Sequence, residues 1–279
     1  MPDIAVTPLT TVLGAEVSGV DLSSPVDDLS TAAIRGALLD HKVLFFRKQS
    51  LDPTSQARLA SHFGELTPAH PVEPSVEGHP EILSLDSDDG ARADVWHSDL
   101  TFQECPPLGA MLHAVVVPEV GGDTIWSDMA AAYDSLSPTM QSFLAGLTAT
   151  HSADKAGGYF AARDTFGDKA AAMATAAAEP AHHPVIRRHP ETGRPSIFVN
   201  PLFTTKIDGL RRRESDALLD LLYDTSIRPE HQLRWHWSAG DVAFWDNRCT
   251  MHYALLDYGN ERRRMERVAL EGDRPVGVQ

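Results

Sequence analysis

Helical and strand-like patterns alternate in the first part of the chain. Apolar positions recur at i, i+1, i+4 and i+5 over residues 30–40, which is the spacing of one helical face. The continuous apolar run at 43–46 is short enough to form a buried strand. Asp52 and Pro53 then offer an N-cap and a first-turn proline for a second helix, which we expect to end near Phe63 because a glycine follows.

Further along the chain most apolar runs are short, and Gly, Pro and Asp separate them. The turn-forming residues at 189–193 favour an antiparallel hairpin of the runs on either side. Helical patterns interrupt the series at 130–147, as a helical hairpin, and at 214–223. Many short strands with few helices predict a mainly β fold with a closed or sandwiched core, rather than alternating βαβ units. The expected strands are 82–85, 95–102, 111–117, 124–127, 183–188, 196–200, 233–237, 242–245 and 265–270.

The stretch at 155–180 differs from the rest of the chain. It holds a glycine pair and then an alanine-rich run without large apolar side chains to anchor it. Long insertions in compact domains are lids or disordered linkers, although an alanine run also suits a plain surface helix. We expect a mobile, lid-like insertion, with the surface helix as the alternative. No repeat and no break in composition divides residues 1–279, so a single domain is expected.

Composition and charge exclude several classes of protein. With 42% hydrophobic and 23% charged residues, the 279-residue chain has the composition of a globular protein. Asp and Glu number 39 against 24 Lys and Arg, and the net charge of −15 repels nucleic-acid phosphates. Cys105 and Cys249 lie far apart, which fits the reducing cytoplasm. The N-terminal residues contain no basic leader, and no apolar run is long enough to span a membrane. We therefore expect neither secretion nor membrane insertion.

A candidate metal site combines one histidine–aspartate pair with a distant histidine. His97 and Asp99 are two residues apart, so on a strand they point to the same face. His252 follows a predicted strand and turn and offers a third ligand. Two histidines and one carboxylate form the facial triad of non-haem Fe(II), which leaves coordination positions open. The alternatives are a solvent-exposed pair at a strand end, or a zinc site that uses Cys249 with His252.

The run from Arg262 to Arg267 is unusual in so acidic a chain. If it forms a strand, Arg263 and Arg267 share one face with Met265, and that face points inward. Buried guanidinium groups need anionic partners, and the carboxylate or sulfonate of a small molecule would satisfy them bidentately. Internal Asp or Glu partners are one alternative, and a solvated charged face is another.

Together these residues resemble the Fe(II)/2-oxoglutarate-dependent dioxygenase superfamily, in its taurine dioxygenase branch. The resemblance implies a double-stranded β-helix, which is a jelly-roll core with helices packed outside it. It covers nearly the whole chain and rests on the motifs WHSDLTF at 96–102, GGDTIW at 121–126, WDNR at 245–248 with His252 after it, the arginine run, and residues 14–22 and 43–47.

The resemblance also implies roles for individual residues. His97, Asp99 and His252 are the implied Fe(II) ligands, with 2-oxoglutarate and O₂ as cosubstrates. In this family an arginine that matches Arg263 holds the remote carboxylate of 2-oxoglutarate, and a threonine that matches Thr124 assists it.

Substrate-binding residues follow from the same resemblance. Arg267 and His70 match residues that bind the sulfonate of taurine, and Phe203 matches an aromatic residue of the substrate pocket. Glu73 and Ala93 stand where the taurine enzyme carries a tyrosine and an asparagine, which weakens the case for taurine itself. Glu73 either pairs with a substrate ammonium or faces solvent.

The implied reaction is hydroxylation of the carbon next to the sulfonate of taurine or a related compound. The product collapses to an aldehyde and sulfite, while 2-oxoglutarate becomes succinate and CO₂. Enzymes of this branch also act on alkyl sulfate esters and on small carboxylates such as phenoxyacetates, and these are the alternative substrates. A non-catalytic anion-binding β-barrel protein and a zinc hydrolase are alternatives of other classes. Relatives are commonly dimers or tetramers, so a homo-oligomer is expected.

Overall fold

Both faces of strand β3 (Val43–Phe46) are covered, which explains why its sequence is apolar throughout. Val43 and Phe45 pack against a second sheet, whereas Leu44 and Phe46 pack against helices. A strand between two apolar layers loses the alternation that a half-exposed strand shows. The structure is a computed structural model, and it describes the chain except residues 1–3, 69–73, 91–92, 157–178 and 279.

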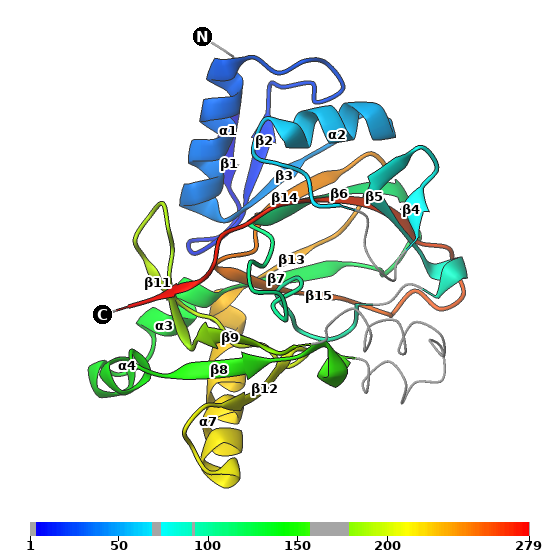
Figure 1. Cartoon of the computed structure of the whole chain (residues 1–279). Coiled ribbons are helices and arrows are strands. Elements are labelled where there is room, and N and C mark those ends of the chain that lie inside the picture. The colour runs from blue at the N-terminus through cyan, green and yellow to red at the C-terminus, as the bar shows by residue number, and fades with distance from the viewer. Residues whose placement is uncertain (1–3, 69–73, 91–92, 157–178, 279) are drawn as a thin grey trace.

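An eight-stranded sheet forms the larger wall of the core (Figure 1). Besides β3, its strands are β1 (Ala5–Pro8), β2 (Ala15–Ser18), β4 (Ser75–Val76), β5 (His79–Asp86), β6 (Gly109–Val116), β14 (Val242–Asp246) and β16 (Arg264–Leu270). Their order is β1-β2-β3-β14-β6-β16-β5-β4. Neighbouring strands are antiparallel except β2 and β3, which run parallel.

Three smaller sheets of three strands each complete the β structure. The first is β13 (Gln232–Trp235), β7 (Thr124–Asp128) and β15 (Thr250–Ala254), in that order. The second is β12 (Thr204–Ile207), β8 (Thr148–His151) and β9 (Ala181–Pro184), and the third is β11 (Pro195–Ile197), β10 (Ile186–Arg188) and β17 (Val276–Gly277).

The sheet β13-β7-β15 faces the large sheet and closes the core between them. Trp126 on β7 and Trp235 on β13 pack against Phe45 and Trp245 of the large sheet. The rings of Phe45 and Trp235 stack with their centroids 3.9 Å apart. Aromatic side chains bury large apolar areas, so this layer contributes strongly to stability. The expected sandwiched β core is confirmed.

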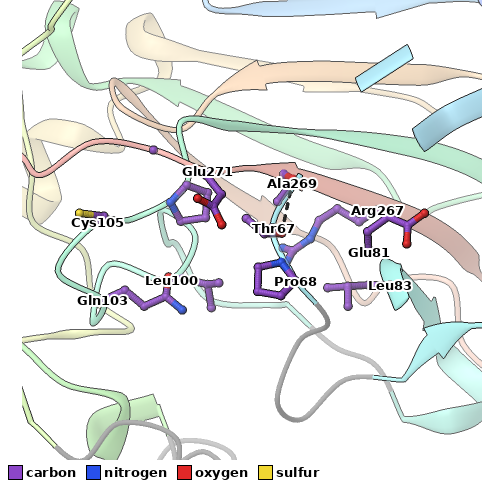
Figure 2. A pocket seen from close by; sticks show the side chains of 12 residues that line it. Thr67, Pro68, Glu81, Leu83, Leu100, Gln103, Cys105, Arg267, Ala269 and Glu271 are labelled. Atoms are coloured by element: carbon purple, nitrogen blue, oxygen red, sulfur yellow. Dashed lines mark hydrogen bonds between the residues drawn. The ribbon is translucent and has the colours of Figure 1, made fainter. Parts of the chain in front are cut away.

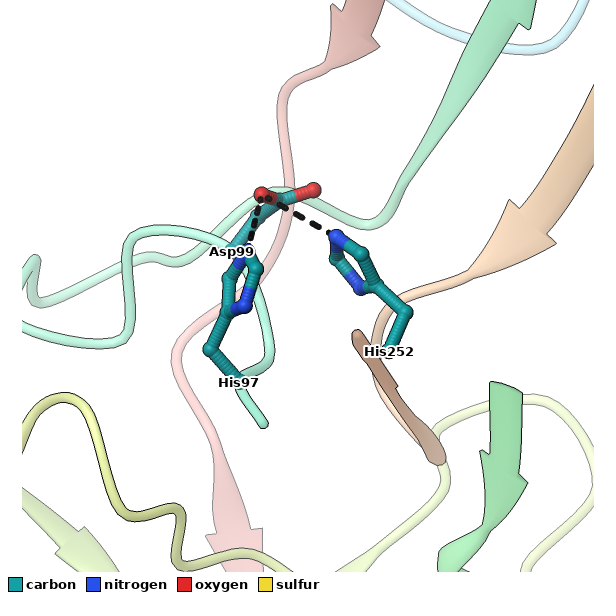
Figure 3. A group of neighbouring side chains, drawn as sticks. All are labelled: His97, Asp99 and His252. Atoms are coloured by element: carbon teal, nitrogen blue, oxygen red, sulfur yellow. Dashed lines mark ion pairs between the residues drawn. The ribbon is translucent and has the colours of Figure 1, made fainter. Parts of the chain in front are cut away.

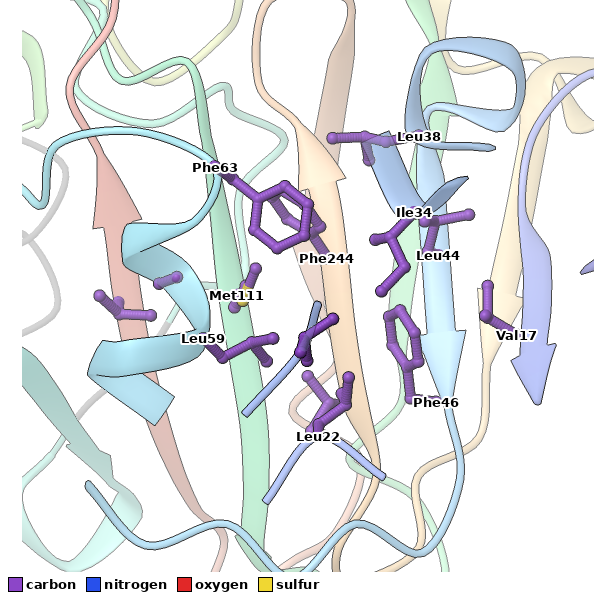
Figure 4. Packing of buried hydrophobic residues seen from close by; sticks show 14 of the residues in the cluster. Val17, Leu22, Ile34, Leu38, Leu44, Phe46, Leu59, Phe63, Met111 and Phe244 are labelled. Carbon is purple, nitrogen blue, oxygen red and sulfur yellow. The ribbon is translucent and has the colours of Figure 1, made fainter. Parts of the chain in front are cut away.

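Helices α1 (Asp28–His41) and α2 (Pro53–Ser61) cover the outer face of the large sheet (Figures 1 and 4). Ile34 of α1 and Leu59 of α2 belong to one apolar cluster with Phe244 of β14. Both helices begin where an aspartate caps them. The predicted cap of α2 is confirmed, because its aspartate accepts a hydrogen bond from the backbone of Ser55 and Pro53 follows at the first turn.

Helix α3 (Met129–Asp134) contacts β11, and helix α7 (Arg212–Ser226) contacts β12 (Figure 1). The helical hairpin expected at 130–147 is present as a pair of short helices, and α7 buries Leu218 and Leu222 against Ile207 of β12. No helix in the described part of the chain is long and apolar enough to cross a membrane. The other short helical elements are α4 (Pro138–Leu144) and two 3₁₀ turns, η1 (Ser87–Asp89), which follows β5, and η2 (Pro229–His231).

The strand expected at 95–102 is wrong. In this stretch only His97 forms a β-bridge, with His252, and turns follow it. Leu100 has a φ of +49°, a left-handed conformation that ends an extended run. The pattern misled because Ser98 and Asp99 are buried through their polar contacts and not through strand alternation.

The predicted hairpin around 189–193 is confirmed, because β10 and β11 pair antiparallel with Ile186 opposite Ile197. The strand expected at 183–188 is divided, and its first part belongs to β9, which pairs with β8. Most of the lid-like insertion expected at 155–180 lies outside the described residues, so it stays a prediction.

Phe45→Ala tests the packing between the two sheets. Phe45 is fully buried, so we expect its loss to lower the free energy of unfolding by about 3–5 kcal/mol in urea denaturation. Leu29→Ala is the matched control, because Leu29 is 66% exposed and its removal should cost no more than about 0.5 kcal/mol. Equal losses for the two variants would contradict this account of the core.

Candidate functional site

Backbone pairing brings the two predicted histidine ligands together. The His97 N–H donates to the carbonyl of His252 (N···O 3.0 Å), and the His252 N–H donates to the carbonyl of His97 (2.8 Å). Strand β15, which carries His252, pairs antiparallel with β7. In this pairing Trp126 lies opposite His252, and Thr124 lies two residues before Trp126 on β7. The two imidazole rings have centroids 4.2 Å apart, and the His252 ring also packs beside Trp245 at 5.0 Å.

Asp99 completes the group from the turn that follows His97. Figure 3 shows both rings pointing toward its carboxylate. Asp99 Oδ1 lies 3.8 Å from His97 Nε2 and 3.9 Å from His252 Nε2. One ligand atom from each residue lies within 4.8 Å of the other two, and all three residues are buried. The structure therefore brings together the three residues that the sequence singled out.

The two imidazoles are neutral and suited to bind a metal. His97 Nδ1 lies 2.7 Å from the carbonyl oxygen of Val95, so Nδ1 carries the proton and Nε2 keeps a lone pair toward Asp99. Burial lowers the pKa of His97. Burial, together with the neighbouring His97, lowers the pKa of His252 to about 3. Neutral imidazole is the form that coordinates metal ions.

Asp99 is a buried anion with one unsatisfied oxygen. Burial raises its pKa, but the Arg267 guanidinium outweighs this effect and holds the pKa at about 2. Arg267 Nη1 donates to Asp99 Oδ1 at 2.6 Å, so the internal partner considered for Arg267 is present. Asp99 Oδ2 has no hydrogen-bond partner among the described residues. Oδ1, the oxygen that Arg267 contacts, is the one beside the two imidazole nitrogens, and a carboxylate with two imidazoles fits the donor set of a facial triad.

A second group of potential ligands is already satisfied by an ion-pair network. His189, Asp246 and Cys249 place ligand atoms within 4.8 Å of one another. However, Arg248 Nη2 donates to Asp246 Oδ2 at 2.6 Å, and His189 Nε2 lies 3.0 Å from the same oxygen. Burial raises the pKa of the Cys249 thiol, and Cys249 groups with His189 and Asp246 while His252 groups with His97 and Asp99. The zinc pair of Cys249 with His252 is therefore not supported.

Arg263 and Thr124 contact each other at the start of β7. Arg263 Nη2 donates to Thr124 Oγ1 (3.3 Å), and its Nε donates to the carbonyl of Gly122 (2.9 Å). Trp237 Nε1 donates to the same Thr124 oxygen (3.0 Å). Because this oxygen accepts twice, the hydroxyl hydrogen of Thr124 is free to bind an anion. Burial lowers the pKa of Arg263, and no carboxylate among the described residues forms an ion pair with it.

Acidic side chains hold the turn that leads into β7. The Gly122 N–H donates to Asp257 Oδ1 at 2.8 Å. Gly121 has a φ of +85°, and a Cβ atom there would lie 2.8 Å from the same carboxylate oxygen. Asp123 accepts a hydrogen bond from Arg234 at 2.6 Å. Because Gly121 has no side chain, the GGD turn can lie close to Asp257. This contact fixes the Gly122 carbonyl, which accepts a hydrogen bond from Arg263.

The rest of the arginine run divides between core and surface. Met265 is fully buried between the two sheets. Arg262 pairs with Asp86 at 2.6 Å, and Arg264 pairs with Glu266 at 2.8 Å. The arginines that do not face the site therefore have internal carboxylate partners.

Arg267 lines a cavity of about 290 Å³ (Figure 2). Leu83 and Leu100 contribute apolar walls, and the carboxylates of Glu81 and Glu271 lie among the lining residues. Because Arg267 also contacts the carboxylate of the triad, the cavity lies next to the candidate metal centre.

Phe203 and His70 are the other residues expected to bind substrate. Phe203 is 3% exposed in a separate apolar cluster and does not line the cavity beside Arg267. His70 and Glu73 lie outside the described residues. The carbonyl of Ala93 accepts a hydrogen bond from the last residue of β15, close to the histidine bridge.

Several residues that support the site were not predicted from the sequence. Trp237 and Asp257 hold the surroundings of Thr124, and the Asn247 side chain binds the backbone of Asp99. Trp237 stands in the strand predicted at 233–237, but that pattern did not indicate its hydrogen bond to Thr124, and neither Asp257 nor Asn247 belongs to a periodic pattern. Asn247 lies inside the WDNR motif, but the motif carried no indication of its partner.

Comparison with known proteins identifies the family. A family profile described as "Taurine catabolism dioxygenase TauD, TfdA family" matches residues 5–269. The chain belongs to the TauD/TfdA family. An alpha-ketoglutarate-dependent sulfate ester dioxygenase of Pseudomonas putida is 39% identical over 281 residues, which cover 99% of this chain and 92% of the relative. An alkylsulfatase of Acinetobacter baylyi is 38% identical over 273 residues, which cover 97% and 86%.

Solved structures of the TauD/TfdA type have the same fold. The crystal structure of a taurine dioxygenase from Burkholderia xenovorans matches with a TM-score of 0.85 and 38% identity, covering 99% of this chain and 92% of that one. Because TauD-type dioxygenases have a jelly-roll core, the expected double-stranded β-helix is confirmed.

Membership of the TauD/TfdA family settles the class of enzyme. The protein is a 2-oxoglutarate-dependent dioxygenase that uses Fe(II), with 2-oxoglutarate and O₂ as cosubstrates. It acts on a small molecule. The alternatives of a non-catalytic binding protein and a zinc hydrolase are not supported.

Thr124→Val tests the shared hydroxyl. This nearly isosteric change leaves the donors of Trp237 and Arg263 without an acceptor, so we expect the unfolding free energy to fall by about 1–3 kcal/mol. Urea denaturation of the metal-free protein measures the effect. Thr124→Ser keeps the hydroxyl and should remain closer to the wild type. A valine variant as stable as the wild type would show that this hydroxyl is not the acceptor described.

Proposed function

We propose that this protein oxidises a small organosulfur anion, such as taurine, another alkanesulfonate or an alkyl sulfate ester. The observation that carries the proposal is the group of His97, Asp99 and His252 next to two inward arginines, Arg263 and Arg267. The reaction needs two anions, the cosubstrate and the substrate, and the site offers one guanidinium for each.

In this proposal His97, Asp99 and His252 hold Fe(II) as a facial triad. The ion supplies the activation of O₂, while 2-oxoglutarate is oxidised to succinate and CO₂. The protein contributes placement, because the backbone bridge between the two histidines and the burial of Asp99 keep the ligand atoms together in a site shielded from bulk water.

We assign the remote carboxylate of 2-oxoglutarate to Arg263 and Thr124. The guanidinium of Arg263 lacks a carboxylate partner among the described residues, and the hydroxyl of Thr124 keeps its hydrogen available. The two groups lie side by side, so both can donate to one carboxylate.

We assign the sulfonate or sulfate group of the substrate to Arg267. Its Nη1 contacts Asp99, whereas its Nε is buried without a partner among the described residues and so retains a donor for a substrate oxygen. His70 and Phe203 are assigned to substrate binding on the strength of the family resemblance alone. Phe203 does not line the cavity itself but belongs to an apolar cluster against which the cavity residue Leu100 packs.

The cavity beside Arg267 has features that suit two kinds of substrate. Leu83 and Leu100 favour an alkyl chain, whereas the carboxylates of Glu81 and Glu271 suit the ammonium of taurine. The P. putida and A. baylyi relatives support a sulfate ester by their names, and the B. xenovorans structure supports taurine. Small carboxylates such as phenoxyacetates are the alternative, because a guanidinium binds them equally well.

The domain organisation, cellular location and oligomeric state of the enzyme are also proposals. We infer a single domain over residues 1–279 that works in the cytoplasm as a dimer or tetramer, without a nucleic-acid partner. Support comes from the profile match over 5–269, the net charge of −15 and the two free cysteines.

Phe143 and Leu221 form part of an exposed apolar groove that suits a subunit contact. Sedimentation velocity measures the oligomeric state.

A substrate panel tests the proposed function. Succinate formation is followed with Fe(II), ascorbate and air in the presence of taurine, longer alkanesulfonates, alkyl sulfates and phenoxyacetates. Hydroxylation at the carbon that bears the sulfur group releases sulfite from a sulfonate and sulfate from a sulfate ester, each with an aldehyde. We expect stimulation by an organosulfur compound and release of the matching anion.

Asp99→Ala provides the control for the panel, because it removes the anionic ligand of the triad. We expect it to abolish succinate formation and to weaken metal binding. Stimulation by phenoxyacetates alone would refute the organosulfur substrate. Full turnover by the Asp99 variant would refute the proposed triad.

Arg263→Ala tests the assignment of the 2-oxoglutarate site. Charge-assisted hydrogen bonds contribute about 1.5–3 kcal/mol, so the KM for 2-oxoglutarate should rise by roughly tenfold to a hundredfold. Arg262→Ala is the matched control, because this neighbour points to the surface and pairs with Asp86. Its KM should stay within about twofold of the wild type. A similar rise in both variants would argue against a specific contact with Arg263.

A further inference from the structure

The position of Asp99 is not set by a β-ladder. The residue lies in a turn, and the next residue, Leu100, has a φ of +49°. Instead, the side chain of Asn247 binds the backbone of Asp99 on both sides. The Asp99 N–H donates to Asn247 Oδ1 (2.7 Å), and Asn247 Nδ2 donates to the carbonyl of Asp99 (3.1 Å).

Asn247 is itself firmly held. Its Nδ2 also donates to the carbonyl of Pro107 (3.0 Å), and its own N–H donates to the carbonyl of Leu108 (3.0 Å). The preceding residue, Asp246, is fixed by its backbone bond to Lys42 and by the buried ion pair with Arg248. Asn247 is only 1% exposed, so water does not compete for these hydrogen bonds.

We propose that Asn247 is a positioning residue for the metal site. It holds the backbone of Asp99 in the turn and thereby places the carboxylate opposite the imidazoles of His97 and His252. Without this clamp the turn is free to relax, and the carboxylate stays with Arg267, to which it is already bonded. This inference rests on the proposed assignment of the triad as the Fe(II) site.

An asparagine suits this task because the backbone of Asp99 presents one donor and one acceptor. A primary amide presents the complementary acceptor and donor from one planar group. Asn247→Asp keeps the shape and the acceptor for the Asp99 N–H, but it replaces the donor to the two carbonyls of Asp99 and Pro107. Asn247→Ala removes both contacts. A metal site typically loses 10–100-fold in metal affinity when the groups that hold its ligands by hydrogen bonds are removed.

The test is calorimetric titration of Mn(II) into the metal-free protein, which reports on the site without turnover. We expect the dissociation constant to rise about tenfold or more in Asn247→Ala and in Asn247→Asp. Gln56→Ala is the matched control. Gln56 is a fully buried amide that donates to the backbone of Glu266 and does not contact Asp99, so its loss should lower the melting temperature but leave Mn(II) affinity within about twofold.

Two results separate this inference from the proposed function. If the wild type binds Mn(II) no better than Asp99→Ala, the triad assignment itself fails. If the wild type binds well and both Asn247 variants bind equally well, the triad stands and the positioning role is overturned. A fall in melting temperature alone, as in Gln56→Ala, would also overturn it, because it would show a merely structural role.

A measurement on the unaltered protein keeps the proposal testable if the variants do not fold. The Asp99 amide is bonded to Asn247, so its hydrogen exchange in the metal-free protein should be strongly retarded despite its place in a turn. Exchange of Asp99 as fast as that of an exposed loop amide would overturn the proposed clamp.

Discussion

Two backbone hydrogen bonds between His97 and His252 fix the separation on which the whole site depends. They join a segment without regular structure to β15, which is held by β7 inside the aromatic core. Because Trp126 on β7 is fully buried between the sheets, the position of His252 is coupled to the packing of the sandwich. The rigidity of a densely packed core is thus transmitted to the proposed metal ligands through one strand and one bridge.

Burial of charge is the second constraint. The chain is strongly acidic, yet two arginines near its centre offer donors to anions, while the neighbouring Arg262 and Arg264 are paired with carboxylates. A buried guanidinium without a counter-charge is costly, and an anionic ligand relieves that cost. Arg267 illustrates the balance, because it stabilises the Asp99 carboxylate and also lines the cavity next to it.

Much of the fold followed from local pattern. The helix before β3, the capped helix after it, and the short strands of the sandwich form close to where apolar spacing and turn residues placed them. The stretch 95–102 was the exception. It was predicted as one of the short strands between Gly, Pro and Asp residues, but its Ser98 and Asp99 are held by hydrogen bonds to β15 and to Asn247. The pattern of polar and apolar residues does not show whether a polar side chain is exposed or is buried by hydrogen bonds to a distant segment.

The sequence by itself determined the chemical types at the site, namely two histidines, one aspartate and two arginines, together with the family to which they point. Only the tertiary structure decided how these groups are held. Asp99 is positioned by an amide 148 residues away, the turn before Thr124 by Asp257, and the Asp99 carboxylate by Arg267. Hydrogen bonds between distant segments leave no periodic trace, because their partners become neighbours only when the two sheets have packed together.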